Sequence, residues 1–468
     1  MDTKALRQKI LDLAIHGKLV PQDPNDEPAS VLLERIRAKK ERLIKEGKIK
    51  KGKKSAKTSD KPHYPYELPK GWKWCKLGDI AYVGTGATPL TTCKYYYENG
   101  NIAWINSSST KVPFIAKASN FITRKAIEET NCLVYPKGTL VIAMYGEGKT
   151  RGQISELLID AATNQACAAV CPYFEATKEY LKLFFEGNYL HIRALAEGGN
   201  QPNLSLGKIQ NYEIPLPPLD EQKRILEQAK KLLLQVENIE KEKEKNKNSI
   251  KQAKAKILNL AIHGKLVPHD LNDEPASELL RRINPKAEII SDNGHYQNLP
   301  KGWCLVKGKY IFNQMKSCKP IGETFKYIDI DAIDNKRQII SNLKILKVAN
   351  APGRASRFTQ KGDVVFSLVR PYLRNIAIVS ENDCIASTGF YVCHPTEVLL
   401  PKYCYHLMIS DYVINGLNEF MKGDNSPSIN KGDIDNWLFP IPPLAEQKRI
   451  VSKIEEIFAQ LDAIETAL

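Results

Sequence analysis

Arginine, amide and tyrosine side chains gather in two stretches of this sequence, each beside a short apolar run typical of a strand. Arginine can donate two parallel hydrogen bonds to guanine, and asparagine or glutamine can pair in the same way with adenine. Side chains of this kind on loops can therefore read the edges of bases. The candidates are Tyr145, Lys149, Arg151, Gln153, Asn164 and Gln165 in the first stretch and Arg354, Arg357, Arg370, Tyr372, Arg374 and Asn375 in the second.

Each of these residues also has an ordinary structural explanation. Surface solvation, turn chemistry or an internal ion pair accounts for any single one at least as well. The run Thr163-Asn164-Gln165-Ala166, for example, is also typical of a structural turn. The two clusters therefore carry more weight than their individual members.

No segment of the sequence matches the catalytic motifs that we considered. The run AMYGEGKT at Ala143–Thr150 has alanine where a phosphate-binding loop requires its first glycine. Methyl transfer to adenine would need a Pro-Pro-aromatic loop, but both Pro-Pro pairs here are flanked by aliphatic residues. His16 and His263 lack acidic or cysteine partners at ligand spacing, which favours packing or capping roles. We expect no catalytic residues, no metal ligands and no enzymatic activity.

The composition indicates what kind of partner the protein binds and in which compartment it works. The chain has 468 residues, enough for about three domains, and a formal charge of +15, which indicates an anionic partner such as nucleic acid or a membrane surface. No apolar run is long enough for a bilayer span, and the N-terminal stretch lacks the apolar core of a signal peptide. The ten cysteines contain no Cys-x2-Cys pair, so reduced thiols are expected. We predict a soluble cytoplasmic protein that does not bind membranes.

Much of the positive charge lies in one short segment. Residues 37–61 contain twelve lysine and arginine residues against three acidic ones. A charge run of this kind is more typical of a solvated arm than of a dedicated phosphate contact, although both remain open. The net charge therefore says little about the folded domains.

Three blocks of sequence occur twice. AIHGKLVP starts at Ala14 and again at Ala261, each time followed by DEPAS; LPKGW starts at Leu68 and at Leu299. PLPPLDEQKRI, at 215–225, returns as PIPPLAEQKRI at 440–450. About 140 residues separate the second block from the third in each copy, and these inserts barely resemble one another. Matching frames thus hold two unlike domains, which we expect to be α/β or α+β.

The third block predicts the start of a helix. Paired prolines precede it, and an acid sits in the first turn, where the helix dipole favours negative charge. Apolar residues then follow at alternating spacings of four and three, from Ile225 to Ile239 and from Ile450 to Ile464. This is the spacing of a coiled-coil seam, although an amphipathic helix packed on its own domain has the same pattern. The first helix should run for about 40 residues, or about 60 Å.

The repeat is displaced relative to the chain ends. Leu468 occupies the place of Lys243 in the first copy, and Met1 occupies the place of Asn248. The N-terminal segment thus resumes almost where the C-terminus stops. We predict a circularly permuted, pseudo-two-fold repeat in which residues 3–15 complete the helix that starts at 444, with two antiparallel composite helices.

The expected organisation follows from these boundaries. It consists of an N-terminal helical segment (1–37), a lysine-rich linker (38–61), a first variable domain (62–215), a central region with the long helix (216–284), a second variable domain (292–440) and a C-terminal helix (441–468).

This organisation resembles the specificity subunits of type I restriction-modification complexes along essentially the whole chain. The doubled PPLxEQ block carries the most specific part of the resemblance. YGEGKTRG with TNQA, and GRASRF with GDVVFSLVRPYLRN, look like parts of two target recognition domains of different types. The resemblance implies that each variable domain reads half of a split, asymmetric sequence in double-stranded DNA, while the helices set the unread gap.

The resemblance also implies partners. They are two adenine-specific modification subunits that use S-adenosylmethionine and restriction subunits that use ATP and Mg²⁺, with no cofactor in this chain. We expect the repeated helices to dock these partners. The residues assigned to docking and to the spacer are Pro217, Pro218, Glu221, Gln222, Ile225 and Leu232 in the first copy and Pro442, Pro443, Glu446, Gln447, Ile450 and Ile457 in the second.

Two other functions remain open from the sequence alone. Within the same family, the chain could serve a fused methylase-nuclease. Outside it, a coiled-coil scaffold would bind DNA only through its charge, without sequence preference and with strong salt dependence. A stand-alone methyltransferase or nuclease would need motifs that are not recognisable here.

Overall fold

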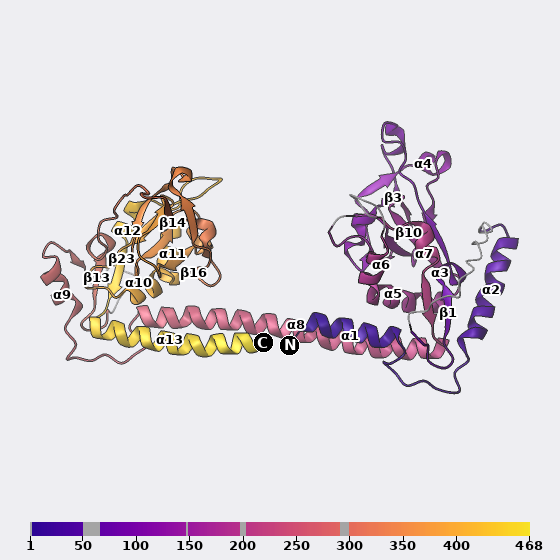
Figure 1. Ribbon diagram of the computed structural model, residues 1–468, viewed down its shortest axis with the longest axis horizontal. Coiled ribbons are helices and arrows are strands. Elements are labelled where there is room, and N and C mark those ends of the chain that lie inside the picture. Colours follow the sequence, from indigo (N-terminus) through magenta and orange to yellow (C-terminus); the bar gives the residue numbers. More distant parts are fainter. Residues whose placement is uncertain (1, 50–65, 147, 197–202, 291–298) are drawn as a thin grey trace. The chain divides into compact units, whose positions relative to one another are not determined.

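The computed structural model describes residues 2–49, 66–146, 148–196, 203–290 and 299–468, and it has a mixed α/β fold (Figure 1). Its elements form two compact units, Met1–Lys241 and Glu242–Leu468, and the boundary falls inside one long helix. No described helix is both long enough and apolar enough to cross a bilayer.

The first unit consists of a helical frame around a mainly β insert. Its helices and strands are α1 (Thr3–Ile15), α2 (Ala29–Lys45), β1 (Lys73–Lys76), α3 (Leu77–Ile80), β2 (Ala81–Thr85), β3 (Ile102–Ile105), β4 (Phe114–Ile115), β5 (Asn120–Ile122), α4 (Arg124–Glu129), β6 (Val134–Tyr135), β7 (Leu140–Ala143), β8 (Ile154–Leu157), β9 (Ala161–Thr163), β10 (Cys167–Pro172), α5 (Lys178–Gly187), α6 (Tyr189–Ala194), α7 (Leu206–Gln210), β11 (Glu213–Leu216) and the start of α8 (Leu219–Ile262).

The second unit has the same plan and includes the end of α8. Its other elements are α9 (Ala276–Ile283), β12 (Ile289–Ile290), β13 (Cys304–Lys307), β14 (Thr324–Ile328), β15 (Ile333–Asp334), β16 (Ile339–Ile340), β17 (Lys344–Lys347), β18 (Ala355–Thr359), β19 (Val364–Ser367), β20 (Ile376–Ile378), β21 (Cys384–Ser387), β22 (Phe390–Cys393), α10 (Pro401–Met408), α11 (Asp411–Asn418), α12 (Lys431–Asn436), β23 (Leu438–Ile441) and α13 (Leu444–Ala467).

The predicted long helix is confirmed. Helix α8 runs for 44 residues from Leu219, directly after the paired prolines, and α13 begins in the same way after Pro443. Each helix has the expected acid in its first turn. The repeated block therefore builds the same helix start twice.

Helix α1 packs antiparallel to the first half of α8. The two are linked at one end by an ion pair between Arg7 and Glu240, and at the other Arg224 of α8 donates a hydrogen bond of 3.0 Å to Asp26, which follows α1. Between these points Leu11 and Ala14 share a buried core with Ile225. Part of the predicted seam thus packs inside its own unit.

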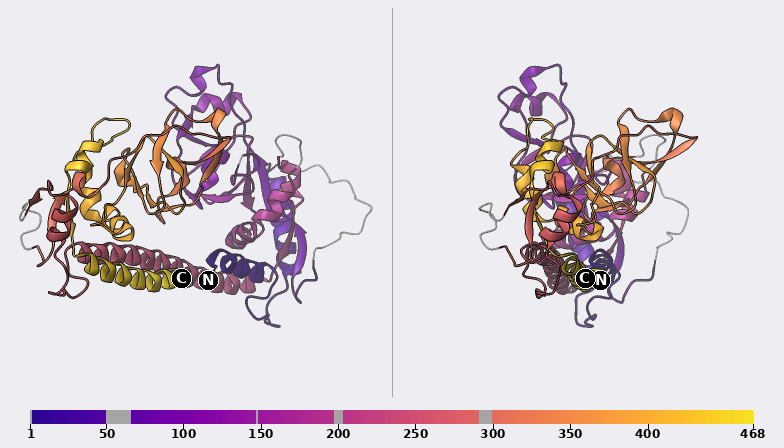
Figure 2. Two further views of the ribbon diagram at one scale, coloured as in Figure 1. Left: turned by 60° about the vertical axis from the view of Figure 1, so that its left-hand side comes forward. Right: turned by 90° about the vertical axis from the view of Figure 1, so that its left-hand side faces the viewer.

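Helix α13 packs in the same sense against the second half of α8 (Figures 1 and 2). Lys254 pairs with Asp462 and also lies over the ring of Phe458, and Arg449 binds Asp273 at 2.6 Å. Leu258 and Ile450 lie in one buried core. The contacts of the first unit thus have counterparts at repeated positions in the second.

The glutamates that start the two helices are buried within their own units. The indole Nε1 of Trp72 donates to Glu221 at 2.9 Å, and that of Trp303 donates to Glu446 at 3.1 Å. Burial raises the pKa of both carboxyls, although the indole donors oppose this effect. The assignment of Glu221 and Glu446 to partner docking was therefore wrong, because these side chains are almost fully covered by their own frame.

The glutamines that follow them are also buried, with unequal sets of partners. Gln447 donates to the carbonyl groups of Val398 and Pro442 and accepts from the amide of Leu400. Gln222 donates to the carbonyl of Pro217, and its Oε1 has no partner among the described residues. The docking assignment of Gln222 and Gln447 was wrong for the same reason, and the flanking Pro217, Pro218, Pro442 and Pro443 are buried too.

The two variable domains share one strand arrangement despite their unlike sequences. The sheet β5-β3-β9-β6 of the first and the sheet β17-β14-β21-β18 of the second have the same succession of antiparallel, parallel and antiparallel pairs. In addition, β7 pairs with β8 and β10 as β19 pairs with β20 and β22. The connections β7–β8 and β19–β20 are therefore equivalent.

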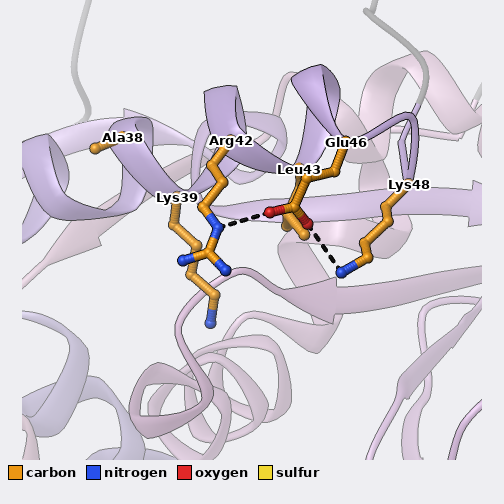
Figure 3. A pocket seen from close by; sticks show the side chains of 6 residues that line it. All are labelled: Ala38, Lys39, Arg42, Leu43, Glu46 and Lys48. Atoms are coloured by element: carbon orange, nitrogen blue, oxygen red, sulfur yellow. Dashed lines mark hydrogen bonds and ion pairs between the residues drawn. The ribbon is translucent and has the colours of Figure 1, made fainter.

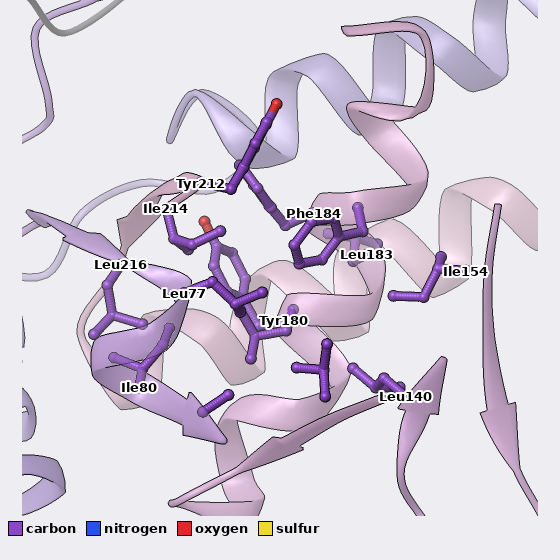
Figure 4. Packing of buried hydrophobic residues seen from close by; sticks show 14 of the residues in the cluster. Leu77, Ile80, Leu140, Ile154, Tyr180, Leu183, Phe184, Tyr212, Ile214 and Leu216 are labelled. Atoms are coloured by element: carbon purple, nitrogen blue, oxygen red, sulfur yellow. The ribbon is translucent and has the colours of Figure 1, made fainter. Parts of the chain in front are cut away.

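Alternate residues of the central strands enter different cores. Leu140 packs with Tyr180 and Phe184 of α5 on one side of β7 (Figure 4), whereas Val141 enters a second core with Ile105. Val364 and Val365 of β19 are divided in the same way. Burial on both faces explains why these strands are continuous apolar runs in the sequence.

The lysine-rich segment begins as a helix and not as a linker. Helix α2 extends to Lys45, so residues 38–45 of the predicted linker are helical. Glu46 forms ion pairs with Arg42 and Lys48 at the edge of a shallow pocket (Figure 3), and these hydrogen bonds lower the pKa of Glu46. The remainder of the predicted linker lies largely outside the described residues.

The unequal partners of the two buried glutamines give a stability prediction. We expect Gln447→Ala to lower the free energy of unfolding by about 3 kcal/mol or more, because three buried backbone groups lose their partner at about 1–3 kcal/mol each. Gln222→Ala should cost about a third as much, since one such group is affected. Urea unfolding of the full chain measures both, and equal losses would contradict this account.

Candidate nucleic-acid interface

The equivalent connections β7–β8 and β19–β20 contain most of the polar residues selected from the sequence. Both connections leave their sheet through the same backbone contacts. The amide of Met144 donates to the carbonyl of Ala166 at 2.8 Å, as Leu368 donates to Gly389 at 2.8 Å. The next contact also repeats, because Leu204 donates to Met144 as Ile429 donates to Leu368. Two unrelated sequences are thus held in the same position.

The fold of the second domain brings the segment around Arg354 close to the β19–β20 connection. The amide of Thr388, in the β21–β22 turn, donates to the carbonyl of Arg354 at 2.8 Å, and the next residue of this turn, Gly389, accepts from Leu368. Arg354 and the β19–β20 connection therefore border the same turn, although they are far apart in sequence. The side chain of Arg354 is exposed, which leaves it available to a ligand.

The two arginines of the β19–β20 connection bind the protein itself. Arg370 donates to the carbonyl of Asn425 at 2.8 Å, although the residue remains exposed. Arg374 forms an ion pair with Asp411 and donates to the carbonyl of Ile409 at 3.1 Å. The guanidinium of Arg374 thus anchors the loop to helix α11, and the internal ion pair is the explanation that applies to it.

Asn375 and Arg357 are also poorly placed for base contacts. Asn375 is 6% exposed, and its carbonyl accepts from Ser367, so its prediction as a base-reading residue was wrong. Arg357 lies half-buried at a bulge of β18, where its Nε is buried without a partner among the described residues. Tyr372, in contrast, is 45% exposed.

In the first domain the equivalent loop is supported by helix α6. The hydroxyl of Tyr189 donates to the carbonyl of Lys149 at 2.6 Å, and Arg193 donates to the carbonyl of Arg151 at 3.3 Å. The side chain of Lys149 is exposed, Tyr145 is 38% exposed and Arg151 is half-buried. Backbone carbonyls thus anchor this loop, which leaves the Lys149 amine on the surface.

The amide residues of the first domain divide between turn and surface. Asn164 accepts from the amide of Ala166 through its side chain, so it forms the structural turn that the sequence left open. Gln165 is exposed and accepts from the hydroxyl of Thr88. Gln153 is half-buried, and its Oε1 has no partner in the described part of the chain.

Basic side chains surround a cavity next to the first loop. Lys4 and Arg7 of α1 line it together with Lys111 and Lys149, above an apolar floor that includes Phe185. Glu186 also lines this cavity, and burial raises the pKa of its carboxyl. The field at this edge of the loop is therefore positive, which suits an anionic ligand.

The residues that support the loops were missed in the sequence, although a signal was present. Residues 198–209 (GGNQPNLSLGKI) match 423–434 (GDNSPSINKGDI) in glycine, asparagine, proline and isoleucine positions. This fourth repeat includes the N-caps Ser205 and Asn430 of α7 and α12 and, in the second domain, the Asn425 carbonyl that binds Arg370. Few positions of this match are identical, so the sequence alone does not reveal it. The equivalent hydrogen bonds from Leu204 to Met144 and from Ile429 to Leu368 show which residues correspond.

The predicted spacer residues outside the helix starts differ in burial. Ile225 and Ile450 are fully buried, whereas Leu232 and Ile457 are half-buried. Among the described residues, no group of three or more His, Cys, Asp or Glu side chains could hold a metal ion.

Comparison with known proteins identifies the family. The type I restriction modification DNA specificity domain matches residues 69–251 and 305–468. The type I restriction enzyme EcoAI specificity subunit of Escherichia coli is 28% identical over 550 residues, covering 97% of this chain and 88% of that subunit. The EcoEI specificity subunit of the same species is 26% identical over 564 residues, covering 99% and 90%. The chain belongs to the type I restriction-modification specificity family.

A solved structure shares the fold. It comes from work on the structural basis underlying complex assembly and conformational transition of the type I R-M system. It superposes on this chain with a TM-score of 0.54, and the two sequences are 19% identical. The superposition covers 86% of this chain and 94% of that one.

The anchoring role of Arg374 can be tested without DNA. We expect Arg374→Ala to speed amide hydrogen exchange across residues 368–376 and to lower stability by about 1–2 kcal/mol, because charge-assisted hydrogen bonds are lost. Arg354→Ala is the matched control, since its exposed side chain should leave both quantities unchanged. Hydrogen exchange followed by mass spectrometry distinguishes the two, and an unchanged loop in the Arg374 variant would contradict the assignment.

Proposed function

We propose that this chain is the DNA sequence-recognition subunit of a type I restriction-modification complex, in which each variable domain reads one half of a bipartite, asymmetric site. The observation that carries the proposal is the equivalence of the two loops: unlike sequences, one bearing Tyr145 and Lys149 and the other bearing Tyr372, connect equivalent strands. The exposed Arg354 lies outside the second loop and borders the turn that this loop also contacts. Membership of the specificity family supports it.

The asymmetry of the site follows from the unlike loops. Two identical readers on a repeated frame would select a palindromic sequence, whereas two different readers select unrelated half-sites. In each domain, exposed cations would contact phosphates and fix the register, and side chains of the loop would read base edges. Arg374 and Asn375 would support this surface without touching bases.

The helices would set the unread gap between the half-sites. The supporting observation is the repeated contact set: α1 packs on the first half of α8 through the same kinds of contacts that α13 makes with the second half. We infer a circularly permuted, pseudo-two-fold frame with antiparallel coiled-coil spacers. Because a helix rises about 1.5 Å per residue, inserting one turn in α8 and its partner helices would widen the gap and leave both half-sites unchanged.

The partners would supply the chemistry. Two modification subunits would methylate adenine with S-adenosylmethionine, and restriction subunits would use ATP and Mg²⁺, while this chain would remain non-catalytic and cytoplasmic. Leu234 of α8 and Ile464 of α13 are more than half exposed, and docking of partner helices would cover them. The buried helix starts would fix these surfaces and not contact the partners.

The decisive experiment maps methylated adenines in cells that carry this chain with its neighbouring modification subunit, and in cells that lack the chain. A split motif with an unread centre should appear with the chain and disappear without it. A purified complex that binds DNA with no sequence preference would overturn the proposal and favour a scaffold.

Single substitutions should separate the two readers. We expect Arg354→Ala to relax one half-site and Lys149→Ala to relax the other, each by about 5- to 100-fold, because a base contact is lost. Methylation rates on duplexes mutated in one half-site at a time measure this. An effect of either variant on both half-sites would contradict the division of reading between the domains.

A further inference from the structure

The β19–β20 connection is a short loop with an unusual backbone. Its centre is a single turn of 3₁₀ helix (Pro371–Leu373) flanked by Arg370 and Arg374, which have φ values of 49° and 57°. Residues other than glycine rarely adopt this left-handed conformation, and they keep it only where surrounding contacts impose it. The loop is therefore held in one shape by its neighbours.

The contacts that impose this shape come from both sides of the turn. The amide of Arg370 donates to the carbonyl of Pro427, and its guanidinium to the carbonyl of Asn425, each at 2.8 Å. On the other side, Arg374 binds Asp411 and the carbonyl of Ile409. Both arginines thus act as braces, and the residues between them form the tip.

The tip exposes two large side chains to solvent. Tyr372 is 45% exposed and Leu373 is 39% exposed, and the described residues provide no hydrogen-bond partner for the tyrosine hydroxyl. Arg354 is exposed and borders the β21–β22 turn, which Leu368 at the start of this loop also contacts. Two adjacent apolar side chains on a braced turn, next to cations that suit phosphates, are the components of a wedge that enters a base stack.

The equivalent loop of the first domain lacks this geometry. It contains Gly146, Gly148 and Gly152, all with positive φ, and its exposed tyrosine, Tyr145, stands at the base of the loop. Glycine adopts a positive φ without strain, so this loop does not need the kind of bracing that Arg370 and Arg374 receive. The wedge geometry therefore belongs to the second domain.

We propose that Tyr372 and Leu373 insert between two adjacent base pairs of the half-site read by the second domain and unstack them. This inference rests on the proposed function and adds a distortion of the DNA to it. Pyrimidine–purine steps unstack most easily, so the wedge selects such a step without hydrogen bonds to its bases. Arg370 and Arg374 maintain the strained turn. This role explains why their guanidiniums bind other groups of the protein and are not left for DNA.

The test uses the complex assembled with its modification subunit and duplexes of the mapped motif, each with 2-aminopurine at one position. Unstacking raises the fluorescence of 2-aminopurine. We expect a rise at one step of the second half-site, at a position other than the methylated adenine, whose own extrusion from the stack would also give a signal. Tyr372→Ala combined with Leu373→Ala should abolish this rise and weaken binding about tenfold.

Two controls make the experiment specific. Tyr372→Phe keeps the ring and should retain the signal, and Ile345→Ala removes an apolar side chain that is 71% exposed on β17 and should also retain it. A complex that methylates its split motif but gives no rise at any such step would overturn the wedge and leave the proposed function intact. Loss of partner assembly in the double variant would equally overturn it, by showing that the tip contacts protein. Absence of any selected motif would instead count against the proposed function itself.

Discussion

The structure depends on a buried junction at the start of each spacer helix. Here the carboxylate of Glu221 or Glu446 accepts from a tryptophan indole, and the repeated blocks meet. LPKGW supplies the tryptophan, DEPAS supplies the aspartate that binds Arg224 or Arg449, and the PPLxEQ block supplies the glutamate and the arginine. These blocks recur in the sequence because they contact one another. Gln22 also donates to Glu221, and His269 contacts Glu446, so the junction satisfies each buried carboxylate with more than one partner.

This junction also explains how the variable domains can differ. In each unit the strand after LPKGW pairs with the strand before the paired prolines, β1 with β11 and β13 with β23, so both ends of the domain are fixed at the helix start. Everything between these strands can change if it preserves the sheet pairings. The loops at the end of the central strands are therefore displayed in the same way by unlike sequences. A frame of this kind keeps the position of a reading surface constant while its chemistry varies.

In the β19–β20 loop and its surroundings, some side chains hold the loop in place and others remain exposed for DNA. Arg370 and Arg374 are among the base-reading candidates in the sequence, yet their guanidiniums bind carbonyls and a carboxylate of the protein. Their binding leaves Arg354, Tyr372 and Leu373 facing outward. A braced loop loses little conformational entropy on binding, so more of each contact contributes to discrimination. The first loop reaches its shape differently: three glycines adopt positive φ, and Tyr189 and Arg193 hold its backbone carbonyls.

The sequence by itself determined the features that depend on neighbours along the chain. Periodicity and paired prolines predicted α8 and α13, and exact repeats predicted the two frames and the positions of the variable domains. Only the tertiary structure decided the role of individual side chains, because that role depends on partners far away in sequence. Arg374 meets Asp411, Asn375 is covered by its own domain, and Glu221 and Gln222 point into their unit and not toward a partner. The lysine-rich segment likewise begins as part of α2 because Lys40 meets the Gly78 carbonyl and Leu43 packs on the core. Local pattern fixes backbone and register, whereas burial and long-range pairing fix which polar groups remain for a ligand.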